Sequence, residues 1–404
     1  MKPVSREPQR FTLIVTGGTA GTLKPQGCAC RRLGGIERRA GFIAQTSAAS
    51  SPLLVLDSGG LLFAPGTVPS QEDLRNAGFL LSSLRHMQTA ALNVSASDCA
   101  AGAEFLKKSA GQVPLLSANL RDSATQELLF SPYLITTVNR SRIGIFGLAG
   151  PSAASGTTGI YADDPIASAG PVVKALQRAR CDAIVLLSQL SEAHNLRLLS
   201  DVPGIHFVFG SSDAPARAAA LRSGDSYAFT PGQGTHAAVV ECLLEGRGPA
   251  FVCAGENTTE RRPDMPAQPA RGSFTFHLAP LDSSVPADPA VELLLETFRE
   301  EGARRQLNSR GLHYRDAVPV VDMSGLTETG RRRALRLMNA IACKNRPIAA
   351  CAAGSQQCRD IGGLVVEGVR AGRTDGAIQF MVQRELQALA RRGDVPLDKS
   401  VPVH

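Results

Sequence analysis

The feature that most constrains the fold is a recurring unit, in which a short apolar run ends in glycine and a segment with helical spacing follows. Residues 11–15 run into Gly17 and Gly18, and residues 52–56 run into Asp-Ser-Gly-Gly at 57–60. Short apolar runs bounded by turn residues are typical of buried strands. Because strands that alternate with amphipathic helices build layered domains, the pattern predicts an α/β fold.

The same pattern continues through the first two thirds of the chain. Apolar runs predict further strands at residues 113–116, 142–148, 182–187 and 205–209. Helical spacing predicts helices at residues 171–180 and 192–199, and a late strand follows at residues 236–244. Residues 255–272 are rich in Pro, Arg and Thr, so we expect a loop or linker there.

The length of 404 residues predicts more than one domain, because single cores usually stop growing at roughly 250–300 residues. We assign residues 1–275 to the large domain and residues 326–404 to a helical tail. Residues 276–325 connect the two with the end of a strand at 274–278, a long helix at 289–307 and a linker. Tail helices are expected at residues 328–342, 355–371 and 375–392, with Gly372 as the residue after one helix and Thr374 as the N-cap of the next.

Composition excludes some classes of function. The chain is 43% hydrophobic and 20% charged, which is typical of folded globular proteins. It has no apolar run of 18 residues, so no membrane span is expected. The net charge of +7 comes from scattered arginines with only 5% aromatic residues, which predicts no specific nucleic-acid partner and leaves weak affinity for acidic surfaces open.

The start of the chain and its cysteines leave the compartment open. Residues 1–11 are polar and contain no apolar stretch typical of a signal peptide, so the protein is either cytoplasmic or has lost its leader. Nine cysteines is an odd number, so at least one thiol is unpaired or pairs between chains.

Over residues 11–300 the order of these loops resembles the 5′-nucleotidase branch of the calcineurin-like metallophosphoesterases. The resemblance implies a layered metallophosphoesterase-like β-sandwich flanked by helices, of class α/β, beside the small all-helical C-terminal domain. It also implies two metal ions held between the loops that follow the strands. Such a pair activates water and binds the phosphoryl oxygens, so the chemistry needs carboxylate, imidazole and amide side chains there.

Position by position, the resemblance implies that the metal ligands are missing. In the first two loops Gly18, Ala20 and Gly60 stand at ligand positions, and only the structural aspartate is kept, as Asp57. In the later loops the replaced ligands are Ala96, Ser97, Gln189, Ser212 and Ala214. We therefore expect no catalytic residue, no metal and no cofactor at this place.

A rebuilt metal site is an alternative, in which ligands have moved by a residue or two. The candidates near the loops are Asn93, Asp98, Gln189, His206 and Asp213, which supply few strong ligands. That interpretation keeps a 5′-nucleotidase-like phosphoester hydrolase open.

Two groups of cysteines are candidate thiol sites. Residues 23–39 resemble a bacterial subgroup of the same family with a Pro-Cys-Gly-Cys loop; here Gln26 replaces the first cysteine, Cys28 is kept and Cys30 is additional. Arginines beside Cys28 and Cys30 would favour the thiolate, which suggests redox chemistry or metal binding, although a surface loop with two idle thiols fits as well.

The tail supplies a second group of cysteines. It is similar to the small helical module of cytochrome c maturation proteins, with Cys343 kept and Arg346 in the place of the second cysteine. Cys351 and Cys358 follow, so the Cys-x-x-Cys pattern is broken, and a structural helical hairpin fits equally well.

These observations favour a non-catalytic binding or assembly protein that holds another protein through its helical tail. A thiol-dependent redox protein and a hydrolase with a rebuilt site are the alternatives. The family resemblance suggests a periplasmic protein, but the sequence itself shows no signal peptide.

Overall fold

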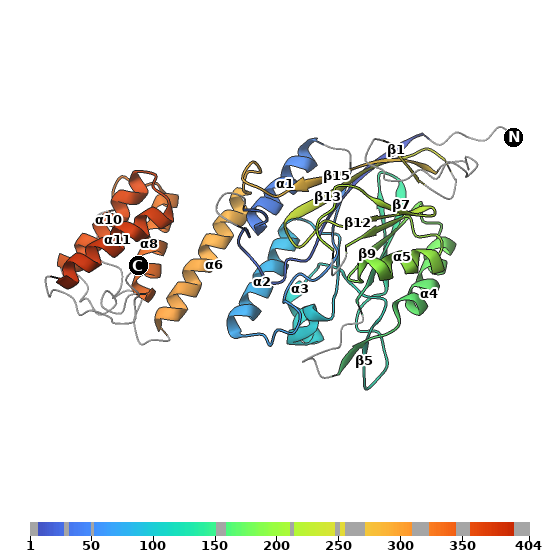
Figure 1. Ribbon diagram of the computed structural model, residues 1–404, viewed down its shortest axis with the longest axis horizontal. Coiled ribbons are helices and arrows are strands. Elements are labelled where there is room, and N and C mark those ends of the chain that lie inside the picture. The colour runs from blue at the N-terminus through green and yellow to red at the C-terminus, as the bar shows by residue number, and fades with distance from the viewer. Residues whose placement is uncertain are drawn as a thin grey trace. The chain divides into compact units, whose positions relative to one another are not determined.

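Figure 1 shows a computed structural model of the chain. It describes residues 7–27, 32–49, 52–150, 159–210, 214–246, 251–254, 271–308, 323–344 and 356–391. The chain divides into two compact units, Met1–Val291 and Glu292–His404. Among the described residues, no helix is long and apolar enough to cross a membrane.

The first unit contains a β-sandwich. One sheet has seven strands in the order β14-β15-β13-β1-β2-β3-β4, and β1 to β4 are parallel. Its strands are β1 (Gln9–Thr16), β2 (Leu53–Asp57), β3 (Ala91–Asn93), β4 (Leu115–Leu116), β13 (His236–Leu244), β14 (Phe251–Cys253) and β15 (Gly272–Pro280). Because β1, β2 and β3 are parallel, their carboxyl ends deliver three loops to one edge.

The second sheet has six strands in the order β11-β12-β10-β9-β7-β6. Its strands are β6 (Tyr133–Val138), β7 (Ser141–Leu148), β9 (Ala183–Ser188), β10 (Phe207–Phe209), β11 (Leu221–Ser223) and β12 (Ser226–Phe229). Strands β7, β9, β10 and β12 are parallel. A separate two-stranded sheet pairs β5 (Leu120–Asp122) with β8 (Ile160–Ala162).

The main core lies between the two large sheets and is rich in phenylalanine. Phe207 of one sheet contacts Phe274 of the other with ring centroids 5.3 Å apart, and Phe229 contacts Phe276 at 4.7 Å. Aromatic pairs at such distances add stability beyond the apolar area that they bury. The sandwich is therefore tied together from its inner faces.

Helices cover both outer faces of the sandwich (Figure 1). On one side lie α1 (Ile36–Ala49), α2 (Gln71–His86) and α3 (Ala103–Ala110), drawn in blue to cyan; α4 (Pro165–Arg178) and α5 (Glu192–Asp201), in green, lie on the other. A short 3-10 helix, η1 (Ser97–Ala101), follows β3. A capping box of Ser70 and Asp73 begins α2, and Ser191 caps α5.

The second unit is helical. The chain passes into it along α6 (Pro289–Asn308), and α8 (Glu328–Lys344), α10 (Gln356–Arg370) and α11 (Asp375–Arg391) follow. Their apolar stripes share one core that includes Leu337, Val365 and Ile378. Gly372 has a φ of 67° and the Thr374 hydroxyl accepts a hydrogen bond from the Ala377 amide, as the sequence predicts for a tight helical hairpin.

The α/β sandwich with a helical C-terminal region confirms the predicted fold class, and several element boundaries differ. The strand predicted at residues 113–116 is only Leu115–Leu116, because Pro114 cannot donate to a ladder. The helix predicted at 171–180 begins six residues earlier, where Asp164 caps it. The linker predicted at 255–272 is wrong at its end, because Gly272 already belongs to β15 and pairs with Leu244 of β13. Residues 255–270 of that linker lie outside the described residues.

Candidate functional site

The five loops singled out in the sequence lie together at the carboxyl edge of the sandwich. The loop after β2 contacts all the others. Its backbone bonds the loop after β1, through Gly18 N to Gly59 O at 2.8 Å, and its Ser58 carbonyl accepts from Gln189 Nε2, after β9, at 3.0 Å. It also meets the loop after β3 through Asp98 and the one after β10 through Gly210. The convergence predicted from the parallel strands is confirmed.

Backbone hydrogen bonds close the space between the first two loops. Besides the Gly18 bond, the Ala20 amide donates to the Gly60 carbonyl at 2.8 Å and the Gly21 amide to the Leu61 carbonyl at 2.9 Å. Three successive bonds of this kind form a short ladder between loops. Gly18 and Ala20, which stand at ligand positions of the resembled family, are thus engaged through their backbones.

Ser58 fills the middle of the loop cluster. It is buried, and a Cβ built at Gly17 would lie 2.0 Å from its Oγ. A Cβ at Gly210 would lie 2.9 Å from the same atom and 2.4 Å from the Ser188 carbonyl. Glycine is needed at both positions because any side chain would collide with Ser58 or the backbone.

A buried ion pair lies beneath the loops. Asp57, at the end of β2, is fully buried, and its Oδ2 accepts from Arg39 Nη1 of α1 and from the Thr16 hydroxyl, both at 3.0 Å. Arg39 also donates to the Thr19 hydroxyl. Burial raises the pKa of the Asp57 carboxyl, and the Arg39 charge opposes that shift. The Asp57 carboxylate, which could bind a metal ion, and the Arg39 guanidinium, which could bind an anion, are therefore bonded to each other.

A second buried carboxylate joins the loops after β2 and β3. Asp98 accepts from the backbone amides of Gly60 at 3.0 Å, Leu62 at 2.8 Å and Ser95 at 3.0 Å, and from the Ser95 hydroxyl at 2.7 Å. Burial raises the pKa of Asp98, while these four hydrogen bonds oppose the shift. With so many donors satisfied by one side chain, Asp98 holds the two loops together and has little capacity left for a ligand.

The remaining polar side chains at this edge are also engaged. Asn93 Nδ2 donates to the carbonyls of Ser58 and Leu148, at 2.9 and 3.1 Å. Its Oδ1 is buried without a partner among the described residues, but Gly147 packs so closely that a Cβ there would lie 2.3 Å from it. Glycine at 147 therefore leaves that oxygen unobstructed, and a larger residue there would collide with it.

The residues at this edge do not fit the two metal ions that the resembled family uses. Among the described residues, no group of three or more His, Cys, Asp or Glu side chains is placed to hold a metal ion. Of the candidates for a rebuilt site, His206 lies elsewhere, with its Nδ1 accepting from the Ile184 amide in the second sheet. Ser212 and Asp213 lie outside the described residues, and Ala214 is buried.

Sequence reasoning missed the role of Arg39. The signal was present, because Arg39 falls in the apolar stripe of α1 at i+3 from Ile36, beside Ala40 and Ile43, and all four are buried. A charged residue in such a stripe is rarely buried unless it is paired. Spacing alone did not show that the partner is Asp57.

The candidate thiols fall mostly outside the described residues. Cys28, Cys30 and Cys351 lie outside them entirely, while Cys343 and Cys358 lie in α8 and α10 without a described side chain. Three described thiols elsewhere, Cys99, Cys181 and Cys242, are buried, and burial raises the pKa of each. The redox hypothesis for Cys28 and Cys30 remains a prediction.

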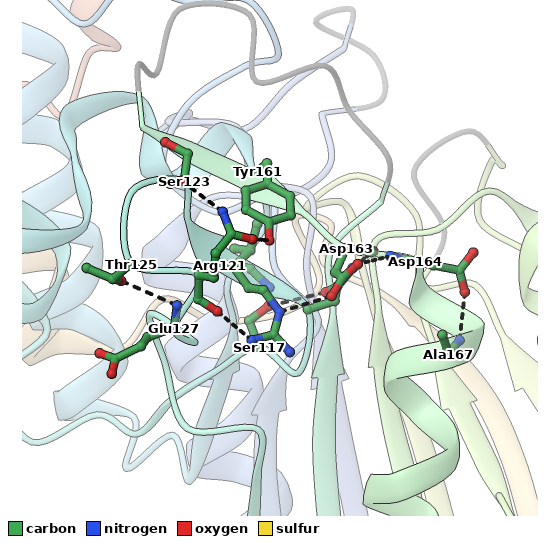
Figure 2. Close-up of polar contacts among 12 residues, drawn as sticks. Ser117, Arg121, Ser123, Thr125, Glu127, Tyr161, Asp163, Asp164 and Ala167 are labelled. Atoms are coloured by element: carbon green, nitrogen blue, oxygen red, sulfur yellow. Dashed lines mark hydrogen bonds and ion pairs between the residues drawn. The ribbon is translucent and has the colours of Figure 1, made fainter.

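A further polar cluster, on the small sheet, is structural. In Figure 2, Arg121 of β5 reaches Asp163, with its Nε 3.0 Å from the carboxylate, and Tyr161 of β8 points to the same turn, where it donates to the Gln126 side chain. Arg121 Nη1 also donates to the Gln126 carbonyl at 2.7 Å. These contacts hold the β5 turn and β8 together, so the cluster offers no separate site.

No model of a known protein family matches the chain, and no curated protein matches it. Among solved structures, it is similar to a 5′-nucleotidase precursor from Thermus thermophilus, with a TM-score of 0.57 and 18% identity over 77% of this chain and 61% of that one. The chain thus spans only about three fifths of that nucleotidase.

Two other solved structures support the same fold. The calcineurin-like phosphoesterase YfkN from Bacillus subtilis has a TM-score of 0.57 and 14% identity, over 73% of this chain and 98% of that one. The sulfate thiohydrolase SoxB from Thermus thermophilus has a TM-score of 0.57 and 15% identity, over 80% and 64%. At such identities the likeness shows the metallophosphoesterase-like fold and not the chemistry.

Proposed function

We propose that this chain is a non-catalytic binding or assembly protein, built on a metallophosphoesterase-like sandwich and holding a protein partner through its helical unit. The first half of the proposal, the absence of catalysis, is supported by the closed loop cluster. Gly18, Ala20 and Gly60 offer no ligand atoms, and backbone bonds and Ser58 occupy the space between the loops. Two-metal hydrolysis needs ligands and an open position for water and substrate, and the described residues supply neither.

Exposed apolar side chains support the second half of the proposal. Within the helical unit, Leu293 and Leu294 of α6 are 44% and 47% exposed, and Phe380 of α11 is 66% exposed. Phenylalanine is among the residues enriched in protein interfaces. A small helical unit that leaves such residues uncovered is suited to bind another protein.

The first half is tested by hydrolysis. The purified chain is given bis-p-nitrophenyl phosphate and 5′-nucleotides with Mn, Zn or Fe supplied, beside a known metallophosphoesterase as positive control. The proposal expects no turnover above the protein-free blank. Turnover that a chelator removes and added metal restores would contradict it and favour a rebuilt metal site.

The second half is tested by photo-crosslinking in the cells that make the protein. A photoreactive phenylalanine replaces Phe380, and in a matched variant it replaces Thr125, an exposed turn residue of the α/β unit. The proposal expects one defined protein adduct from position 380 and none from position 125. Equal labelling at both positions, or none at 380, would contradict a docking role for α11.

A further inference from the structure

At the end of the sandwich away from the loop cluster, part of β2 in the first sheet lies beyond the end of its neighbour β3. Strand β3 begins opposite the fourth residue of β2, since Leu56 pairs with Ala91 and Asp57 with Leu92. The earlier residues of β2, Leu53 to Val55, therefore extend beyond the end of β3. Apart from the Val55 carbonyl, which accepts from the Ala90 amide, the described residues leave this edge of β2 open.

The backbone of Leu53 points out of that open edge. The Thr12 amide of β1 donates to the Pro52 carbonyl and the Ser58 amide donates to the Thr16 carbonyl, so the even-numbered residues of this segment bond to β1. Because successive residues of a strand direct their backbone groups to opposite sides, those of Leu53 point away from β1.

Strand β6 faces the same gap with a second open edge. It is the last strand of its sheet, and within the described part of the chain β7 is the strand that it pairs with. Asn139 and Arg140 have φ of 45° and 64°, which makes a two-residue turn between the paired residues Val138 and Ser141. In such a hairpin the pair beside the turn is hydrogen-bonded, so Thr137 directs its backbone N–H and C=O outward.

The gap between the two edges is a cavity of about 450 Å³. Its buried floor is aliphatic and its exposed rim carries hydroxyl, amide and imidazole groups. The floor includes Ala40, Ile43, Leu54, Val55, Met87 and Val138, and the rim includes Ser47, His86, Gln88, Thr137 and Asp288. We call this cavity the β2–β6 notch. Its volume lies within the range of roughly 300–1,000 Å³ that is usual for binding sites.

The lining narrows the class of occupant. It contains no Phe, Tyr or Trp ring, so the single imidazole of His86 is the one ring of the lining that could stack on a nucleobase. Its one carboxylate is Asp288, whose Oδ1 accepts from the Ala290 and Val291 amides and lies 3.3 Å from His86 Nε2. The lining has no Lys or Arg, so a phosphate or another strong anion would find no cationic partner other than His86.

We propose that the β2–β6 notch binds a short extended peptide of a partner protein, which adds to the free edge of β6 and places an aliphatic side chain on the notch floor. Two outward-facing strand backbones, an aliphatic floor and a hydrogen-bonding rim are what strand addition requires. This inference rests on the proposed binding function and assigns it a second surface, in the α/β unit.

The test selects linear random peptides displayed on phage against the full chain, and measures the Kd of individually synthesised binders. Ala44→Phe places a ring from an exposed position of α1 into the notch; Ala48→Phe makes the same change at an exposed position of α1 that does not line it. Thr137→Pro removes the outward N–H of β6 and keeps the bonds to β7, whereas Thr137→Ala keeps that N–H.

The proposal expects selected peptides whose Kd rises by tenfold or more in Ala44→Phe and Thr137→Pro and stays within twofold in Ala48→Phe and Thr137→Ala. Methylating alternate peptide amides should weaken binding to the unaltered chain by a similar factor, which keeps the test valid if Thr137→Pro fails to fold. Selected peptides that bind all variants equally, or no selected peptide, would overturn the proposal.

Loss in Ala44→Phe without any effect of Thr137→Pro or amide methylation would also overturn strand addition, since the notch would then accept a side chain only. The outcome is independent of the hydrolysis assay. A chain that binds peptides here and also turns over phosphoesters would refute the proposed non-catalytic role and leave this inference standing.

Discussion

The two ends of the β-sandwich contrast with each other. At the carboxyl edge, backbone ladders, Ser58 and two buried carboxylates fill the space between the loops. At the opposite end, the first residues of β2 extend beyond the end of β3, and the β2–β6 notch there has a volume of about 450 Å³. The edge where the resembled family places its metals is the closed one. At that edge the buried carboxylates Asp57 and Asp98 bond to groups of the protein itself and brace the loops.

The largest effect expected at the closed edge follows from removing the Arg39 charge. Arg39→Ala leaves the Asp57 carboxylate buried without its cation, which typically costs about 3–5 kcal/mol in the free energy of unfolding. Arg38→Ala is the matched control, because the Arg38 hydrogen bond to the Arg32 carbonyl is exposed, and it should cost less than about 0.5 kcal/mol. Urea unfolding measures both.

A double-mutant cycle sharpens this test. Arg39→Met combined with Asp57→Asn removes both charges, so the double variant should lose less stability than the sum of the two single variants. Strict additivity would show that the pair does not act as a unit and would weaken the account of the closed edge.

The next effect concerns Asp98. Asp98→Ala leaves two buried backbone amides and one half-buried amide without an acceptor, which predicts a loss of about 3 kcal/mol or more. Asp122 accepts two backbone amides in an exposed turn, where water can replace the carboxylate, so Asp122→Ala should cost about 1 kcal/mol or less. Thermal unfolding compares the two, and equal losses would contradict the bracing role of Asp98.

A smaller effect is expected from placing a carboxylate at Gly60, which stands at a ligand position of the resembled family. Gly60 has a φ of 63°, and its Cβ would lie 3.0 Å from Gln189 Oε1, so Gly60→Asp should cost about 1–3 kcal/mol. Gly66 has a φ of 77° and open space around it, so Gly66→Asp carries the backbone cost alone. If Gly60→Asp is the less costly of the two, the loops are not closely packed.

The last prediction concerns the relative reactivity of the thiols, which leaves the fold unchanged. If Cys28 and Cys30 form a working thiol site, at least one should be alkylated at pH 6–7 about tenfold faster than Cys181, whose pKa is raised by burial. Peptide mapping by mass spectrometry gives the rates. Equally slow labelling of all three would leave the redox alternative without support.

Much of the fold could be predicted from the sequence, because buried strands and Gly turns are local signals. The pattern at 236–244 matches β13 without error, and the ends of β1 and β2 lie within two residues of the prediction. Strand β6 could not be found, since it has no alternation of buried and exposed residues: five of its six side chains are exposed or half-buried. The notch was missed too, because it depends on β6 and on where β3 begins relative to β2, and neither is a local signal.

The candidate site was predictable only in part. The resemblance supplied the loop positions, and parallel strands brought them together as expected. The pairing of Arg39 with Asp57 and the four hydrogen bonds of Asp98 could not be predicted, because they depend on tertiary packing and not on local spacing. Arg39 and Asp57 are 18 positions apart, and Leu62 and Asp98 are 36 apart.

The most direct test of the central claim is the metal content of the chain purified without chelator, measured by inductively coupled plasma mass spectrometry after dialysis against Mn, Zn or Fe. Gly60→Asp serves as the variant closest to the resembled ligand set. The account predicts well under one tightly bound metal per chain in both proteins, because the loops offer few ligand atoms and the space between them is filled. Two tightly bound metals per unaltered chain would contradict it.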